Sequence, residues 1–131
     1  AESGWYADDP EGLLGQMDKE LWRARRLVVD TGLHAKRWTR EQAIEYMMDK
    51  TGMPETDVVA EIERYLVMPG QALAYKVGMN KILELRERAK TELGPKFDLK
   101  RFHDLVLGGG AMPMTLLEQR VDAWIETERA R

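Results

Sequence analysis

The spacing of apolar residues is the feature that most limits how this chain can fold. Apolar residues recur at alternating intervals of three and four, whereas a strand would require alternation at every second residue. No segment alternates convincingly with period two, and no turn dipeptide joins two β-branched runs. In the first predicted helix this spacing aligns one apolar seam: Leu14, Met17, Leu21, Ala24, Val28 and Thr31. The sequence therefore predicts an all-α fold.

Residues that start and stop helices divide the chain into about six predicted helices. Asp9 is typical of an N-cap with Pro10 in the first helical position, and Gly32 is typical of a helix stop. Proline and glycine separate the later segments in the same way. The predicted helices run over about 10–31, 39–52, 54–68, 71–93, 98–108 and from 115 onward.

Two threonines are predicted to begin helices with a capping box. Thr39 is followed three residues later by Gln42, and Thr115 is followed by Glu118. The connections between predicted helices are short, and no internal repeat interrupts them. We therefore expect one helical domain over residues 1–131, packed as an irregular bundle.

Composition excludes several classes of protein. The 131 residues are 44% hydrophobic and 33% charged, which is typical of a folded globular chain. The absence of cysteine excludes disulfides and thiolate chemistry. A net charge of −3 argues against general nucleic-acid binding, because phosphate contacts need a cationic excess. No apolar run approaches the ~18–20 residues that span a bilayer, so we expect no membrane insertion.

A basic cluster is the first candidate binding feature. Between residues 23 and 40 there are six cations and the single acid Asp30. Such a patch can hold a carboxylate or phosphate, since arginine presents a bidentate fork. The alternative is a solvated helix face with an Arg26–Asp30 pair. The six cations are Arg23, Arg25, Arg26, Lys36, Arg37 and Arg40.

Three further residues carry chemistry that a core does not require. His34 follows the first predicted helix near Asp30, where an imidazole can donate a hydrogen bond or transfer a proton; a lone loop histidine is also an ordinary surface group. Gln71 and Tyr75 share a helix face with Gly78. That face suits the close approach of an extended peptide, or tight helix packing in which Tyr75 reaches a buried partner.

Metal ligands at the required spacings are absent from the sequence. There is no H-E-x-x-H helix, and the two histidines lie far apart in sequence. The eight methionines are typical of core filler. Gly108 to Gly110 follow a helix and lack the Lys-Ser or Lys-Thr of a phosphate loop. The chain therefore contains no self-sufficient catalytic constellation, and we expect it to bind no metal alone.

Three long segments resemble a known family. The chain is similar to the C-terminal region of the bacterial proteins grouped as domain of unknown function 885, which are zinc-metallopeptidase-like. This resemblance spans nearly the whole chain, from about Leu14 to Ile125. The segments are ELWRARRLVVDTGLHAKRWTREQAIEYM, ERYLVMPGQALAYKVGMNKILELRERAKTELGPKFDLKRFHDLVLGGGAMP and LEQRVDAWI.

The resemblance implies that this chain is one part of a larger helical metallopeptidase-like fold. In that family catalysis depends on an H-E-x-x-x-G-H-H-type helix and on a further glutamate in an E-G-W-type segment, and both would lie upstream of this chain. Zinc is then expected as a cofactor of the full-length protein. The expected partners are the N-terminal catalytic part of the same protein and a peptide-like substrate.

The same resemblance assigns roles to particular residues. In helical zinc peptidases a histidine and a tyrosine from the C-terminal part stabilise the oxyanion, and the matching positions here are His34 and Tyr75. Arg23, Arg26 and Gln71 would orient the substrate. Asp30 would orient Arg26 or His34 from behind.

A different class of function remains open on the sequence. The chain can instead be a free-standing, non-catalytic helical binding or adaptor module. An exposed apolar seam favours the fragment, because a missing part must cover it, and also permits self-association. A fully polar surface favours the module. Bacterial cytoplasm and periplasm are both compatible with this composition.

Overall fold

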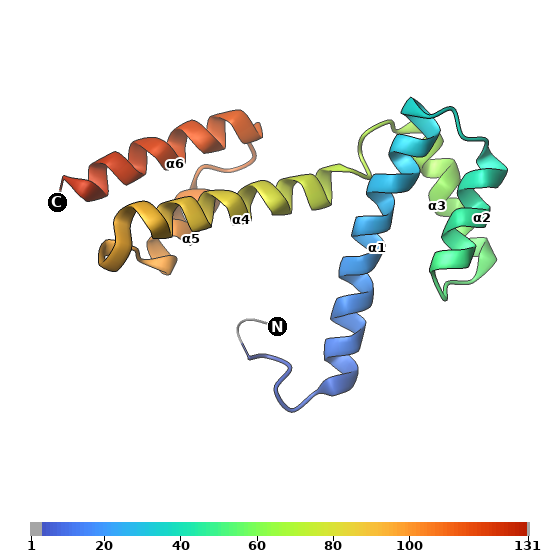
Figure 1. Cartoon of the computed structure of the whole chain (residues 1–131), viewed down its shortest axis with the longest axis horizontal. Helices are drawn as coiled ribbons and strands as arrows, with labels where there is room; N and C mark the ends of the chain where they lie inside the picture. Colours follow the sequence, from blue (N-terminus) through green and yellow to red (C-terminus); the bar gives the residue numbers. More distant parts are fainter. Residues whose placement is uncertain (1–3, 131) are drawn as a thin grey trace. The chain divides into compact units, whose positions relative to one another are not determined.

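The computed structural model describes residues 4–130 and is all-α. Helices account for 78% of the chain, and no strand occurs within the described range. One short 3-10 helix, Gly94–Lys96, follows the fourth α-helix. The α-helices are α1 (Pro10–Ala35), α2 (Arg40–Lys50), α3 (Glu55–Val67), α4 (Ala74–Leu93), α5 (Leu99–Gly108) and α6 (Met114–Arg129), as labelled in Figure 1. The prediction of an all-α fold with six helices is confirmed.

Contacts within the chain group it into two compact units, Ala1–Lys76 and Val77–Arg131. The first unit contains α1, α2, α3 and the start of α4. The second contains the rest of α4 together with α5 and α6. The expectation of one domain over residues 1–131 stays a prediction, and each unit is described by itself.

The first unit is built around the C-terminal half of α1. This half lies beside α2 and α3, while the N-terminal half of α1 extends beyond them (Figure 1). Tyr65 and Met47 are the largest buried side chains of the core. The buried core residues of this unit are Val29, Leu33, Ala43, Met47, Val58, Ile62, Tyr65 and Ala72.

The C-terminus of α1 lies beyond the predicted stop. Asp9 caps the helix as expected, accepting from the Gly12 N–H at 2.8 Å, but Gly32 is a buried helical residue and α1 ends at Ala35. The predicted stop at Gly32 is therefore wrong. The left-handed turn falls at Arg37, with φ 59°, and the Trp38 N–H returns to the Gly32 carbonyl oxygen at 2.9 Å. Gly32 is required for close approach, because a Cβ there would lie 2.5 Å from the Trp38 ring.

The start of α4 also differs from the prediction. The helix begins at Ala74 rather than at Gln71, and residues 68–73 form successive turns. Gly70 adopts φ +79°, a left-handed conformation that glycine reaches without steric cost. Both carboxylate oxygens of Asp30 accept from the Gly70 N–H, each at 3.1 Å. This anchored turn delays α4 by three residues.

One of the two predicted capping boxes is confirmed. On α2 the Thr39 side chain accepts from the Gln42 N–H, and the Gln42 side chain accepts from the Thr39 N–H. The box at Thr115 and Glu118 is wrong, because α6 begins at Met114 after Pro113 and has no side-chain cap. Glu118 instead forms ion pairs with Lys81 and Arg88 of α4.

The second unit combines an apolar core with an ion-pair network. Arg88 bonds Glu118 at 2.5 Å and Asp122 at 2.8 Å, and Lys81 bonds Glu118 at 3.0 Å. These pairs join α4 to α6 along their length. The buried core residues are Leu85, Ala89, Leu93, Phe102, Leu117, Val121 and Ile125.

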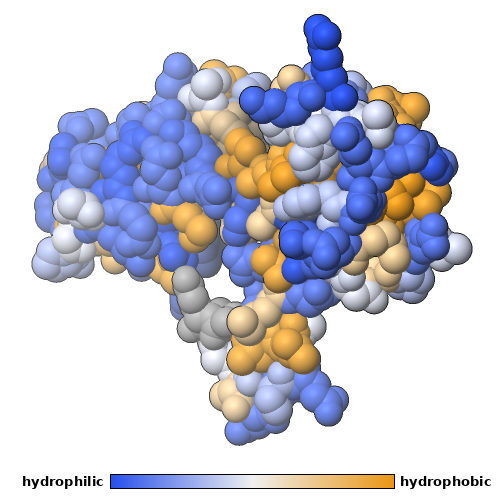
Figure 2. Space-filling model, turned by 45° about the vertical axis from the view of Figure 1, so that its right-hand side comes forward, coloured by the Kyte–Doolittle hydropathy of each residue, from blue (hydrophilic) through white to orange (hydrophobic). Residues whose placement is uncertain are grey.

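The apolar seam of α1 is largely exposed. Leu14 is 68% exposed, Met17 57% and Leu21 49%. Figure 2 shows hydrophobic surface on the N-terminal part of α1, toward the bottom of the view. These side chains line a shallow groove of about 530 Å³ together with Ala24 and Lys76. An apolar surface of this kind marks a contact site for another part of a protein or for a partner.

Among the residues that the structure describes, no helix combines the length and the apolar character that a membrane span needs.

Candidate functional site

Three of the predicted site residues meet in the first unit. Arg26 of α1, Gln71 of the 68–73 turn and Tyr75 of α4 are linked through charged and aromatic residues of α3. We call this group the Arg26 cluster. Its members are Trp22, Arg26, Glu61, Arg64, Tyr65, Gln71 and Tyr75.

Glu61 is the anion at the centre of the Arg26 cluster. It accepts from Arg26 Nη2 at 3.0 Å, from Arg64 Nη2 at 2.7 Å and from the Tyr65 hydroxyl at 2.6 Å. Burial alone would raise the pKa of Glu61, but the hydrogen bonds from Arg64 and Tyr65 and the charges of both arginines together lower it. Burial also raises the pKa of Tyr65, with its bond to Glu61 adding to the effect. Glu61 is therefore a fixed carboxylate that holds two arginines in place.

Arg26 lies among three aromatic rings. Its guanidinium carbon is 5.6 Å from the Trp22 ring centroid, 5.7 Å from that of Tyr65 and 5.3 Å from that of Tyr75. Its Nε is buried and has no hydrogen-bond partner within residues 4–130. The ring faces offer the cation–π contact that partly compensates for this lost hydrogen bond. The cluster thus contains two arginines against one carboxylate, an excess of one positive charge.

The Tyr75 hydroxyl lies at the outer end of the cluster. Tyr75 is 47% exposed, and its oxygen accepts from Gln71 Nε2 at 3.3 Å. Gln71 Oε1 in turn accepts from Arg64 Nη1 at 2.7 Å. A phenol oxygen that accepts from one side still carries a proton to donate on another. The geometry therefore offers a hydrogen-bond donor next to positive charge, which suits an oxygen atom that carries partial negative charge.

Arg26 and Glu61 also line a groove of about 370 Å³. It lies on α1 and α3, with Trp22 and Met53 contributing its apolar surface. Asp57 adds a carboxylate and Lys19 a cation, so both signs of charge are present. The lining residues are Asp18, Lys19, Trp22, Arg26, Met53, Asp57, Ala60 and Glu61.

His34 of α1 contacts the backbone of α3. Its Nε2 lies 3.0 Å from the Tyr65 carbonyl oxygen. Because a carbonyl oxygen can only accept, Nε2 is the donor in this contact. The contact connects His34 to the Arg26 cluster through the backbone of Tyr65. Its predicted role in an oxyanion site stays a prediction.

Asp30 has a different partner from those that the sequence suggested. It is only 2% exposed, and its carboxylate accepts from the Gly70 N–H rather than lying in the exposed Arg26–Asp30 pair. Arg26 pairs with Glu61 instead, so the expected Arg26–Asp30 pair is wrong, while Arg23, Lys36 and Arg37 are exposed. Asp30 thereby holds the turn that carries Gln71.

Arg23 is exposed on α1. Arg23 makes none of the contacts that define the Arg26 cluster within residues 4–130. Its assignment to substrate orientation rests on the family resemblance alone.

Sequence reasoning missed four members of the cluster, Trp22 on α1 and three residues of α3. Glu61, Arg64 and Tyr65 lie within one helical turn of α3, and the Glu61–Arg64 spacing of three is a recognisable ion-pair signal. Nothing in the spacing indicates that Arg26, 35 residues earlier, shares Glu61. That pairing depends on α1 and α3 packing together.

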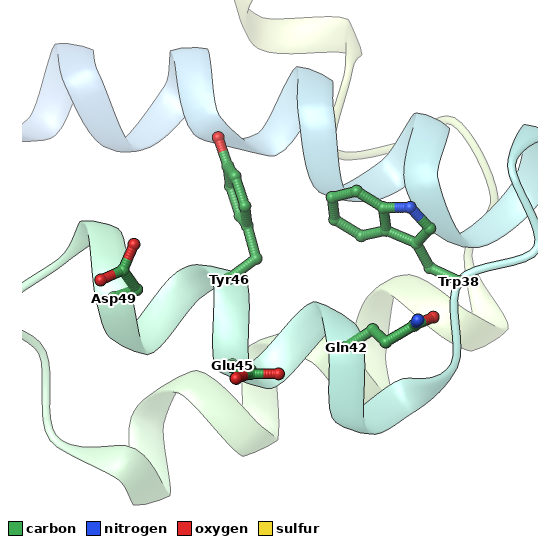
Figure 3. Close-up of a pocket in the computed structure, with 5 residues that line it drawn as sticks. All are labelled: Trp38, Gln42, Glu45, Tyr46 and Asp49. Carbon is green, nitrogen blue, oxygen red and sulfur yellow. The ribbon is translucent and has the colours of Figure 1, made fainter.

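Another pocket, of about 480 Å³, lies on α2 and the residues just before it in the first unit. Figure 3 shows Trp38 and Tyr46 side by side, with the Tyr46 ring pointing toward α1 and the carboxylates of Glu45 and Asp49 on α2. The ring centroids are 5.5 Å apart. Trp38 already packs on Gly32, and Asp49 pairs with Lys50. These side chains have partners that explain them structurally.

Metal ligands do not gather in the part of the chain that is described. Within residues 4–130, no group of three or more His, Cys, Asp or Glu side chains is placed to hold a metal ion.

Comparison with known proteins finds a matching family model and a similar solved structure. The family model described as "Bacterial protein of unknown function (DUF885)" matches residues 1–121. The crystal structure of the "putative lipoprotein from Colwellia psychrerythraea" is 63% identical in sequence and superposes with a TM-score of 0.93 over 96% of this chain. The match covers 22% of that longer protein. No curated protein sequence matches.

Proposed function

Since this chain belongs to the bacterial DUF885 family, we propose that it forms one wall of the substrate cleft of a zinc-dependent peptidase or amide hydrolase. The observation that carries the proposal is Tyr75, which is half-exposed, has the Arg26 guanidinium over its ring and is linked to Arg64 through Gln71. Amide hydrolysis places negative charge on the carbonyl oxygen in the transition state, and a fixed donor stabilises it.

The division of labour follows from what this chain contains. A zinc ion would supply Lewis-acid chemistry in the longer protein, with ligands from residues outside those described here. In this chain, Tyr75 would donate to the carbonyl oxygen, and Arg26 with Gln71 would orient the substrate. His34 would help to stabilise the same oxygen, and the longer protein would be the active unit.

The exposed seam of α1 supports a larger assembly. Leu14, Met17 and Leu21 expose apolar surface that a chain of this size normally buries. The similar crystallised protein is several times longer than the region it shares with this chain. We therefore infer that the N-terminal catalytic part of the same protein packs on this seam. Because the similar protein is described as a lipoprotein, we also infer that the longer protein is exported.

The same groove leaves a second function open. A seam lined by Leu14, Met17, Leu21 and Ala24 also fits an amphipathic helix of another protein. On that basis the chain would act as a non-catalytic binding module, or associate with itself. The two proposals differ in whether Tyr75 matters for turnover.

The test is made in the full-length protein with short peptides as probe, detecting newly released amines. Tyr75→Phe and His34→Ala should each lower turnover at least about tenfold, since an oxyanion donor contributes that much or more. Tyr46→Phe removes a hydroxyl from the same unit outside the Arg26 cluster and is the matched control. Chelation should abolish turnover, and added zinc should restore it.

Two results would overturn the cleft proposal. One is full turnover in both the Tyr75 and the His34 variants. The other is an absence of zinc-dependent amine release in the wild-type full-length protein, which would leave the binding module as the working function.

A further inference from the structure

Arg64 donates a hydrogen bond to Gln71, and its side chain is 32% exposed. We propose that Arg64 is a positioning residue that sets the direction of the Tyr75 hydroxyl by fixing the amide of Gln71. This inference rests on the proposed function for its consequence in catalysis. The orientation itself stands on the hydrogen bonds of the first unit.

The first step is the anchoring of Arg64 by Glu61. Arg64 Nε and Nη2 bond the two Glu61 oxygens at 3.3 and 2.7 Å, a two-point contact on one face of α3. The hydrogen bond that Arg64 donates to Glu61, together with the charge of Glu61, raises the pKa of Arg64 despite some burial. A two-point contact restricts rotation of the guanidinium plane. Nη1 is thereby directed at Gln71.

The second step is the choice of amide orientation. A guanidinium only donates, so the atom of Gln71 that faces Arg64 Nη1 at 2.7 Å must be the oxygen. The NH2 group then faces the Tyr75 oxygen at 3.3 Å. Without Arg64 the amide can turn over, because both of its ends can bond a hydroxyl. The arginine therefore selects one of two arrangements.

The third step concerns the phenol proton. In the observed arrangement the Tyr75 oxygen accepts from Gln71, so its O–H remains available to a ligand. In the reversed arrangement Tyr75 would donate to Gln71 Oε1 and its proton would be taken. The selected ligand is then an oxygen acceptor, such as a carbonyl or carboxylate oxygen, rather than a donor group.

The experiment uses NMR on the 131-residue chain with ¹³C at the tyrosine ζ position. Arg64→Met should shift the Tyr75 Cζ signal and the Gln71 side-chain amide signals, because the amide loses its fixed direction. Arg64→Lys retains a donor and should restore both toward wild type. Arg40→Met removes another arginine ion pair of the first unit, Arg40–Glu63, and should leave both unchanged.

A second variant guards against misfolding of Arg64→Met. Gln71→Met removes the amide and should shift the Tyr75 Cζ signal as well, with helix content by circular dichroism unchanged. Unchanged Tyr75 and Gln71 signals in a folded Arg64→Met protein, or an unchanged Tyr75 signal in Gln71→Met, would overturn the proposal.

Turnover in the full-length protein separates this inference from the proposed function. Arg64→Met should lower kcat about tenfold with little change in KM, and Arg64→Lys should recover most of it. Gln71→Glu keeps a partner for Arg64 but captures the Tyr75 proton, so it should be as slow as Tyr75→Phe. Shifted NMR signals with full turnover in Tyr75→Phe would refute the cleft and retain the orienting role. Unshifted signals would refute the orienting role whatever the turnover.

Discussion

Gly32 offers the sharpest test of the packing in the first unit. A Cβ at this position would lie 2.5 Å from Cδ2 and from Cε3 of the Trp38 ring. Carbon atoms in contact prefer separations of about 3.5–4.0 Å, so Gly32→Ala requires a displacement of about 1 Å. The ring is rigid, and the backbone bond from the Trp38 N–H to the Gly32 carbonyl limits how far it can retreat.

The magnitude follows from two opposing terms. Overpacking of this kind costs about 1–3 kcal/mol, whereas alanine in a helix gains about 1 kcal/mol over glycine. Gly15 lies on the same helix with no heavy atom within 4 Å of a Cβ, so Gly15→Ala receives the gain without the cost. Gly32→Ala should therefore be less stable than Gly15→Ala by about 1–3 kcal/mol.

The assay is urea unfolding followed by circular dichroism and tryptophan fluorescence for both variants. A double-mutant cycle with Trp38→Leu isolates the contact, since most of the Gly32→Ala penalty should disappear when the ring is absent. Equal stability of the two alanine variants would refute the close approach of Trp38. An equal penalty in the Trp38→Leu background would do the same.

Two further predictions concern the Arg26 cluster and the turn beside it. Folding lowers the pKa of Glu61 from 4.5, so the ionised Glu61 stabilises the folded state above that pH, and this stabilisation is lost as the pH falls through the lowered pKa. The difference in unfolding free energy between wild type and Glu61→Gln should therefore shrink below about pH 4.5. A difference that does not change with pH would contradict this. Asp30→Ala should cost about 1–3 kcal/mol and speed hydrogen exchange at the Gly70 N–H, whereas unchanged exchange would show that the carboxylate does not hold the turn.

The helices themselves were predictable because their signals are local. The spacing of apolar residues, the Asp9 cap and the Thr39–Gln42 box each depend on residues within one or two turns. The apolar seam of α1 was also predictable, since apolar residues at helical spacing define one face of a helix whether that face is buried or exposed. Tyr75 and Gln71 stood out for a local reason as well, as polar groups one turn apart.

Boundaries failed where a distant residue decided them. Gly32 resembles a helix stop until Trp38 is seen to occupy the space that a side chain would fill. The start of α4 moved from Gln71 to Ala74 because Asp30, 40 residues earlier, bonds Gly70. Glu118 resembled a capping partner for Thr115 until Lys81 and Arg88 were found to bind it.

What the sequence determined by itself was the all-α class, the order of the helices and several residues of the Arg26 cluster. Only the tertiary structure decided which charges pair, because Arg26 had Asp30 one helical turn away and yet bonds Glu61 from α3. Local spacing limits the partners a side chain can reach within its own helix. Burial then selects among all the partners that packing brings near, since a charge removed from water needs a counterion or a hydrogen-bond donor or acceptor.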